Sequence, residues 1–231
     1  MLRNLVTQEY LQSVPVPEST DSYVAIPHID IINATKEMLD KKGLVVVNET
    51  YRANADGNKM VGMLRINEQS SDMGVMIAFK NSYDRSMSLG FAAGAQVIVC
   101  ENGVVSGEIN LVRKHTGSVV HELNFKIEDT LELLEESFES ILHDSFRLKD
   151  TGLTSFSISQ HLGLMYFEEE LFTPNQVSII RDEFKNSSYP DFKDYNAWSL
   201  YNWCTHALKS SHALNMLQNH ISLHKYMLSN F

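Results

Sequence analysis

One dipeptide, Asn102-Gly103, constrains the fold of this chain more than any other feature. It lies between two apolar, β-branched runs at residues 96–100 and 104–105. Asn and Gly both tolerate positive φ, which a two-residue hairpin turn requires at its central positions. We therefore predict an antiparallel hairpin over residues 96–105 with Asn102-Gly103 as its turn.

Other short apolar runs predict further strands. Residues 44–47 are largely β-branched, and Asp56-Gly57 favours a reversing connection to the apolar segment 60–66. Residues 74–79 and 118–125 also have the composition of strands. Because strands joined by hairpins pair antiparallel, we expect an antiparallel sheet of about five to seven strands.

Helical spacing of apolar residues appears on both sides of the predicted strands. Residues 29–42 carry such a pattern, and Gly43 follows where a helix end favours a residue that tolerates positive φ. A longer stripe predicts an amphipathic helix over residues 128–148. The polar side of that helix is acidic and is either solvated or a docking surface for a basic partner. Its carboxylates are Glu128, Asp129, Glu132, Glu135, Glu136 and Glu139.

The last third of the chain is predicted to be helical. Thr173, Pro174 and Gln176 combine a cap residue, a proline at the first helical position and a reciprocal capping side chain. Asp194 is expected to cap the next helix, and a last helix is predicted over residues 211–228.

This order of elements predicts an α+β fold. We expect an antiparallel sheet of hairpin-linked strands, flanked by a long amphipathic helix, with a helical C-terminal region. Prolines at positions 15 and 17 favour an extended surface segment near the N-terminus. We therefore divide the chain into an N-terminal arm (residues 1–26), an α+β core domain (27–150) and a helical C-terminal region (151–231).

Composition narrows the class of protein. The 231 residues carry 19 Lys and Arg against 29 Asp and Glu, a formal charge of −10. This charge repels phosphate backbones and disfavours a role in coating duplex DNA. No secretory signal is recognisable over residues 1–16, and no apolar run approaches the ~20 residues of a membrane-spanning helix. We expect a cytoplasmic protein with no membrane partner.

Familiar catalytic signatures are absent from the sequence. It contains no Walker-type phosphate loop, no Gly-x-Ser-x-Gly elbow and no Cys-x-x-Cys pair. His220 and His224 lie one helical turn apart, and Cys204 and His206 are close in sequence, but no acidic general base accompanies them. We expect neither a metal nor a cofactor.

Two polar clusters follow predicted strands and are candidate binding sites. The first contains Asn81, Ser82, Asp84 and Arg85, where Asx and Ser side chains favour a structural turn but Asp84 and Arg85 could also form a recognition corner.

The second is the compact cationic run of Arg113, Lys114 and His115. Arg offers a planar fork and Lys a point charge for phosphate. If a polyanion binds this acidic chain, we expect it to bind here.

A third candidate lies on the predicted helix that contains Trp198 and Asn202. Aromatic residues at helical spacing are more often core than a base-stacking platform. A buried amide at Asn202 would require hydrogen-bond partners.

Several of these motifs together resemble a known family. The chain resembles phage- and plasmid-encoded proteins that share a domain of unknown function, number 932. The segments that carry this resemblance are residues 81–86, Gly94, and residues 97–103, 113–116 and 198–205. The resemblance extends from residue 27 to the C-terminus and includes Asn102, which we count as a candidate binding residue. It implies an accessory protein of a mobile element, acting on DNA metabolism or host defence, with no catalytic residue to carry over.

Three functions compete. The first is a non-enzymatic phage or plasmid accessory protein that binds a host or phage protein, for example as an inhibitor of host defence that mimics DNA. The second is binding or annealing of single-stranded nucleic acid through Arg113, Lys114 and His115, as in ring-forming annealing proteins with a similar order of elements. The third is a metal-assisted enzyme acting on nucleotides or nucleic acid through Asp84 and His115. The sequence leaves the formation of a homo-oligomer open. Because carboxylates outnumber cations and no reactive constellation is assembled, we favour association over catalysis.

Overall fold

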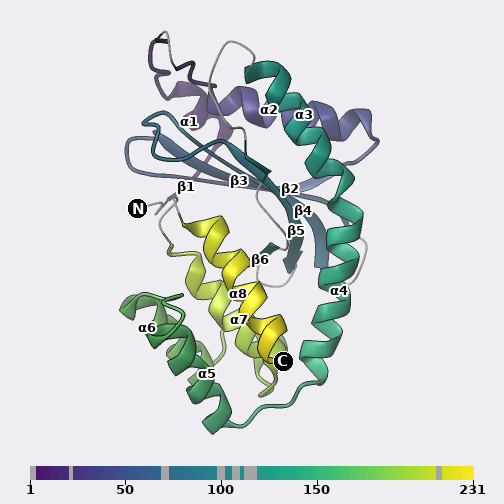
Figure 1. Ribbon diagram of the computed structural model, residues 1–231, viewed down its shortest axis with the longest axis vertical. Helices are drawn as coiled ribbons and strands as arrows, with labels where there is room; N and C mark the ends of the chain where they lie inside the picture. The colour runs from purple at the N-terminus through teal and green to yellow at the C-terminus, as the bar shows by residue number, and fades with distance from the viewer. Residues whose placement is uncertain are drawn as a thin grey trace.

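The computed structural model confirms an α+β fold with a helical C-terminal region (Figure 1). It describes residues 4–20, 23–68, 73–97, 102–105, 110–111, 119–211 and 215–231. No helix within these ranges is both long and apolar enough to cross a lipid bilayer.

An antiparallel sheet forms the centre of the molecule. Its strands are hydrogen-bonded in the order β1-β2-β3-β4-β5-β6, and β7 pairs with the outer part of β5. Each strand from β2 to β5 thus lies beside its neighbour in the chain, as hairpin connections require. The strands are β1 (Asn4–Val6), β2 (Val46–Ala53), β3 (Lys59–Glu68), β4 (Met73–Ser82), β5 (Gly90–Val97), β6 (Asn102–Val105) and β7 (Asn110–Leu111).

The hairpin of β5 and β6 is confirmed, but its predicted turn is wrong. Asn102 pairs with Val97 and Gly103 pairs with Gln96, so Asn102 and Gly103 are strand residues. The connection therefore runs through residues 98–101, outside the described residues. Gly103 serves packing instead of a turn, because a Cβ there would lie 3.3 Å from the sulfur of Met63.

Helices account for the rest of the described chain. They are α1 (Gln8–Ser13), α2 (His28–Lys41), α3 (Val119–Glu132), α4 (Leu134–Asp150), α5 (Ser155–Phe167), α6 (Pro174–Lys185), α7 (Ala197–Leu208) and α8 (Met216–Asn230), with a 3₁₀ turn η1 (Pro190–Phe192). The predicted helix over residues 29–42 is confirmed as α2, and Gly43 follows it with φ +69°. The capping box of Thr173 and Gln176 at the start of α6 is also confirmed.

Three predictions about helices are wrong. The strand expected over residues 118–125 is the first part of α3, where Leu123, Ile127 and Leu131 are buried at a spacing of four. The single helix expected over 128–148 is two helices, because the chain breaks at Leu133 between α3 and α4. Asn196, not Asp194, caps α7.

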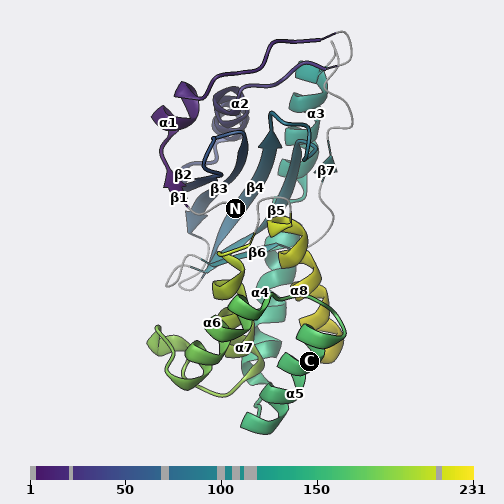
Figure 2. The same cartoon turned by 90° about the vertical axis from the view of Figure 1, so that its left-hand side faces the viewer.

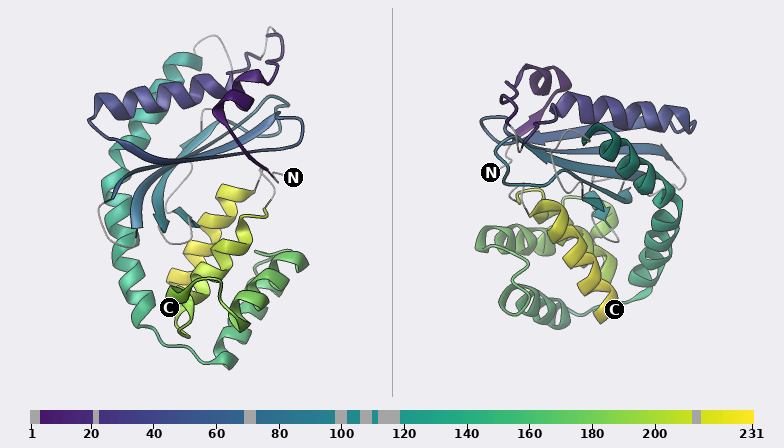
Figure 3. Two further views of the ribbon diagram at one scale, coloured as in Figure 1. Left: turned by 180° about the vertical axis from the view of Figure 1, so that it is seen from behind. Right: turned by 45° about the horizontal axis from the view of Figure 1, so that its top comes forward.

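The helices lie on both sides of the sheet. In Figure 1, α2 and α3 cross above it, α7 and α8 lie below it, and α4 runs from the upper layer down one side. The N-terminal arm packs on the same chain, since β1 pairs with β2 and Leu11 of α1 is buried (Figure 2). Viewed from behind, α5 and α6 lie at the end of the molecule away from α2 (Figure 3).

One hydrophobic core joins these layers. It runs without interruption from Ile31 of α2 through the strands to Trp203 of α7 and Leu223 of α8. The predicted boundary near residue 150 remains a prediction, and the described residues on its two sides share this core.

Candidate functional site

The first predicted cluster begins with two buried residues at the end of β4. Asn81 and Ser82 are 0% and 1% exposed. The Ser82 hydroxyl donates to the carbonyl of Met87 at 3.0 Å and accepts from its N–H at 2.9 Å. These contacts close the loop after β4, so Ser82 stabilises the fold and is not available to a ligand.

Asn81 belongs to a buried network centred on His28. Its amide nitrogen lies 2.9 Å from the carbonyl of Ile26 and 3.0 Å from Nδ1 of His28. Nε2 of His28 lies 2.9 Å from the carbonyl of Gly57, and its ring stacks on Tyr83 with centroids 4.0 Å apart. Burial lowers the pKa of His28 to about 4, so the ring is neutral. The network ties the start of α2 to two loops of the sheet.

Asp84 and Arg85 lie at the surface of the same corner. Asp84 accepts from the N–H of Ser86 at 3.0 Å and lies 3.1 Å from the ammonium group of Lys59. Burial acts to raise the pKa of Asp84, but the Ser86 hydrogen bonds and Lys59 outweigh it and lower the pKa to about 2. Arg85 has φ +62° and lies over the ring of Tyr23 at 4.4 Å. Both side chains are therefore engaged by neighbouring groups of the same chain.

Trp198 lines a cavity of about 520 Å³ between the end of β5 and the start of α7. The indole is 4% exposed, and the ammonium group of Lys149 lies 5.9 Å from the ring centroid. Because the indole is almost completely buried, Trp198 offers no exposed face for stacking a base. The lining residues are Val97, Lys149, Asp191, Phe192, Asp194, Asn196 and Trp198.

The remaining predicted residues that the structure describes do not line this cavity. Asn202 is buried and donates to the carbonyl of Trp198 at 3.0 Å, within α7. Asn102 begins β6, and Arg113, Lys114 and His115 lie outside the described residues. The corner after β4 and the cavity beside Trp198 are formed by different elements, so the predicted residues within the described ranges do not gather at one site.

The predicted histidine pair does not converge on a common point. Nδ1 of His224 lies 3.0 Å from the Tyr201 hydroxyl, and its Nε2 lies 3.8 Å from a carboxylate oxygen of Asp144. His220 instead lines a small cavity under the sheet. Cys204 is buried, and burial raises the pKa of its thiol. Across the described ranges, no three His, Cys, Asp or Glu side chains gather as a metal site requires.

The acidic face predicted for residues 128–148 is present and spans the break at Leu133. Leu133 itself is 46% exposed. Asp129 pairs with Lys126 at 3.3 Å. The other carboxylates are exposed and form no ion pair with a described residue: Glu128, Glu132, Glu135, Glu136 and Glu139. A basic partner for this face remains a prediction.

Sequence reasoning missed a group of cations on one face of the sheet. Arg52 of β2 pairs with Val61, which pairs with Lys80, so the three share the face that lies toward α8. Arg65 lies on the same face, four residues along β3 from Val61. Burial lowers the pKa of Lys80. Arg52, Arg65 and Lys80 lie on three different strands, so only the pairing register reveals that they share a face.

Sequence reasoning also missed an open edge of the sheet. β1 covers β2 only from Tyr51 to Ala53, and the described chain places no strand beside Val46 and Val47 on that side. A groove of about 480 Å³ follows this edge beneath α2. Its lining residues are Lys36, Asp40, Leu44, Val45, Val46, Val47, Asn48 and Glu49.

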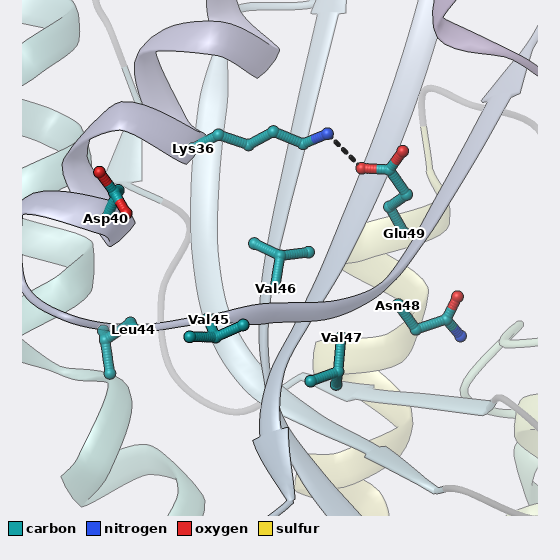
Figure 4. Close-up of a pocket in the computed structure, with 8 residues that line it drawn as sticks. All are labelled: Lys36, Asp40, Leu44, Val45, Val46, Val47, Asn48 and Glu49. Carbon is teal, nitrogen blue, oxygen red and sulfur yellow. Dashed lines mark ion pairs between the residues drawn. The ribbon is translucent and has the colours of Figure 1, made fainter.

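Figure 4 shows how this groove is formed. Lys36 reaches from α2 to form an ion pair with Glu49, and Val46 points toward it. Val47 points the other way, because successive side chains of a strand point to opposite faces. Val45 and Val47 are 60% and 47% exposed, and the register shifts between Val46 and Asn48.

Comparisons with known proteins complete this description. Searches of curated proteins and of solved structures returned no match. A family model described as "Domain of unknown function (DUF932)" matches residues 18–214. This match includes strands β2 to β7, the acidic helices and helices α5 to α7, and the chain therefore belongs to the DUF932 family.

Proposed function

We propose that this chain is a non-enzymatic binding protein that takes an extended segment of another protein onto the open edge of β2. The observation that carries the proposal is the exposure of Val45 and Val47 beside a strand edge that β1 leaves uncovered. The partner that we propose is a host or phage protein, as the mobile-element association of the family suggested.

The pairing of β1 with β2 supports this mode of binding. Leu5 opposes Arg52 in an antiparallel register, and β1 ends at Val6, where the chain turns into α1. A partner strand at Val46 and Val47 would continue the line of β1 along the same edge. Main-chain hydrogen bonds then supply affinity, and alternate side chains supply specificity.

The groove favours a segment of particular chemistry. Val45 and Val47 offer apolar contacts at alternate positions on one side of the edge, while Lys36 and Glu49 flank it with opposite charges. An exposed apolar edge is usually protected against indiscriminate pairing, and the bulge at Val47 has that effect here. We therefore expect a short, extended peptide with apolar residues at every second position.

A display selection tests the proposal with defined ligands. Random peptides displayed on phage are selected on the wild-type chain and counter-selected on a Val45→Lys/Val47→Lys variant. The peptides recovered should alternate apolar and polar residues. Their affinity, measured by fluorescence anisotropy with synthetic peptide, should fall about tenfold or more in the double variant, because the added lysines block strand addition.

A matched control distinguishes binding at the edge of β2 from nonspecific binding to exposed apolar side chains. Phe156 is 78% exposed on α5, and Phe156→Lys should leave the affinity unchanged. Recovery of no peptide, or equal affinity for the double variant and the wild type, would contradict the proposal. So would a concentration-dependent dimer that the double variant abolishes, since the edge would then belong to a second copy of the chain.

One observation favours the second candidate, single-stranded nucleic-acid binding. Arg52, Arg65 and Lys80 place positive charge on one sheet face of an acidic protein, which is what backbone contacts require. Trp198 is too buried to stack on a base. Anisotropy with a labelled oligonucleotide at low salt tests this candidate, and an Arg65→Gln/Lys80→Gln variant should bind more weakly with a shallower salt dependence. Binding that is absent, or unchanged in the variant, would exclude it.

A further inference from the structure

A small cavity lies between the sheet and α8. Its volume of about 40 Å³ exceeds the roughly 10–15 Å³ that one water molecule needs and is far below that of sites for larger ligands. Leu5 and Met216 supply apolar walls, while polar groups come from three different elements. The complete lining is Leu5, Thr50, Arg52, Met63, Gly103, Lys209, Met216 and His220.

His220 supplies a buried polar atom without a partner. The residue is 4% exposed, and its ring donates a hydrogen bond to the carbonyl of Gly103. Nδ1 has no hydrogen-bond partner among the described residues, so Nε2 is the donor to Gly103. A buried nitrogen without a partner costs about 1–3 kcal/mol, and a ligand in the cavity can relieve that cost.

Two cations lie beside this ring. Arg52 extends from β2 and Lys209 caps the end of α7, and both line the cavity. Arg presents a fork of N–H donors, Lys a mobile point charge, and the hydroxyl of Thr50 can donate as well. No carboxylate of the described chain lines the cavity.

We propose that this cavity binds a single phosphate group, held by Arg52 and Lys209 and by Nδ1 of His220. The imidazole takes up a proton as the anion enters, so that Nδ1–H donates to a phosphate oxygen while Nε2–H remains bonded to Gly103. Without an anion, burial and the charge of Lys209 hold the pKa of His220 at about 4 and keep it neutral.

The surroundings of His220 favour this proton uptake only when an anion is present. Arg52 from β2 and Lys209 from α7 oppose a charge on the ring. One turn along α8, His224 is engaged by Tyr201 and Asp144. A bound phosphate would place negative charge directly beside the ring.

Calorimetric titration with inorganic phosphate at pH 6 tests the site. We expect saturable binding of one phosphate per chain, weakened about tenfold or more by Lys209→Met, because a charged hydrogen bond is lost. Lys225 is exposed on α8 and does not line the cavity, so Lys225→Met removes the same charge and should leave the affinity unchanged. Absence of saturable binding, or equal weakening by both variants, would overturn the proposal.

A His220→Asn variant tests whether His220 takes up a proton when the anion binds. Sulfate has the shape of phosphate but does not titrate near neutral pH, so its affinity for the wild type should weaken as the pH rises from 5 to 8. The variant should bind more weakly and lose this dependence, with its fold checked by circular dichroism. Sulfate binding that ignores pH in the wild type would contradict a role for His220.

The source of the phosphate is distinguished by a competition. A labelled single-stranded oligonucleotide that binds wild type but not Lys209→Met, and that phosphate displaces, would identify a nucleic-acid backbone as the source. Phosphate binding without oligonucleotide binding would identify a free or small-molecule phosphate. Both outcomes are independent of peptide binding at β2, so failure of either proposal leaves the other standing.

Discussion

Two buried histidines on opposite faces of the sheet differ in how completely their polar atoms are used. His28 lies on the α2 side and His220 on the α8 side, and burial lowers the pKa of each to about 4. Both nitrogens of His28 have partners, at 2.9 and 3.0 Å. His220 has a partner for only one nitrogen among the described residues and lies beside a cavity.

This comparison shows that burial and a shifted pKa do not by themselves identify a functional group. Perturbed titration is common at sites but also arises in structural networks. What distinguishes His220 is the unused hydrogen-bonding atom, together with space and two cations beside it. His28 is also buried, but both of its nitrogens are hydrogen-bonded, and it serves to join α2 to the sheet.

The largest expected effect is a loss of stability in acid. Both rings have folded pKa values of about 4, below the ordinary value of about 6.5, so the unfolded chain takes up protons first as the pH falls. Their contribution is complete above pH 6.5 and is lost as the pH falls toward 4, by about 3 kcal/mol for each ring as an upper bound. Urea denaturation across this range measures it.

Sulfate should change the contribution of His220 to the pH dependence of stability, but not that of His28, in the same urea denaturation experiment. Sulfate should reduce the slope of the free energy of unfolding against pH by about one proton, or ~1.4 kcal/mol per pH unit, because only His220 lies beside the cavity. If this slope is unchanged at saturating sulfate, sulfate does not act on His220, and the proposed difference between His28 and His220 is wrong.

Truncation of each ring should rank next. His28→Ala should lower the free energy of unfolding by about 3 kcal/mol, since it removes two side-chain hydrogen bonds and a stacked ring from the core. His220→Ala should cost about 1–2 kcal/mol, because only one hydrogen bond is lost. The exposed His143→Ala is the control, and equal costs for His28 and His220 would contradict the comparison.

A smaller effect is expected from Tyr83→Phe. The Tyr83 hydroxyl accepts from the backbone N–H of His28 at 2.8 Å, and removing it leaves a buried donor without that partner. We expect a loss of about 1–2 kcal/mol with the stacked ring retained. Thermal unfolding measures this, and no change in midpoint would mean that water replaces the hydroxyl.

Gly103→Ala should have the smallest effect, below about 1 kcal/mol. A Cβ there would lie 3.3 Å from Met63 and 3.4 Å from Met76, whose flexible side chains can move. The added methyl group also narrows the cavity, so phosphate affinity should fall more than stability. A variant that unfolds would show that this part of the core is more rigid than expected.

The sequence predicted those parts of the fold that depend on local patterns. Helix α2 and the capping box at Thr173 followed from periodicity and cap residues. The pairing of β5 with β6 followed from two apolar runs separated by a turn signal. The predicted turn at Asn102-Gly103 was wrong because a residue that tolerates positive φ does not have to adopt it. The strand at residues 118–125 was wrong because a short apolar run fits a helix equally well.

The candidate sites were harder to predict, because they depend on contacts between distant segments. Asn81 was chosen for its polarity, but its partners at Ile26 and His28 come from another part of the chain. His220 was considered only with His224, one turn away, whereas the structure places it beside Arg52 and Lys209. No spacing along the chain encodes that arrangement.

The most direct test of this account is an NMR titration of the histidine ring nitrogens with and without sulfate. The account predicts that saturating sulfate raises the pKa of His220 from about 4 and leaves His28 at about 4. A His220 resonance that does not respond to sulfate, or a pKa shift of the same size at His28, would contradict the claim that His220 belongs to an anion site and His28 has a structural role.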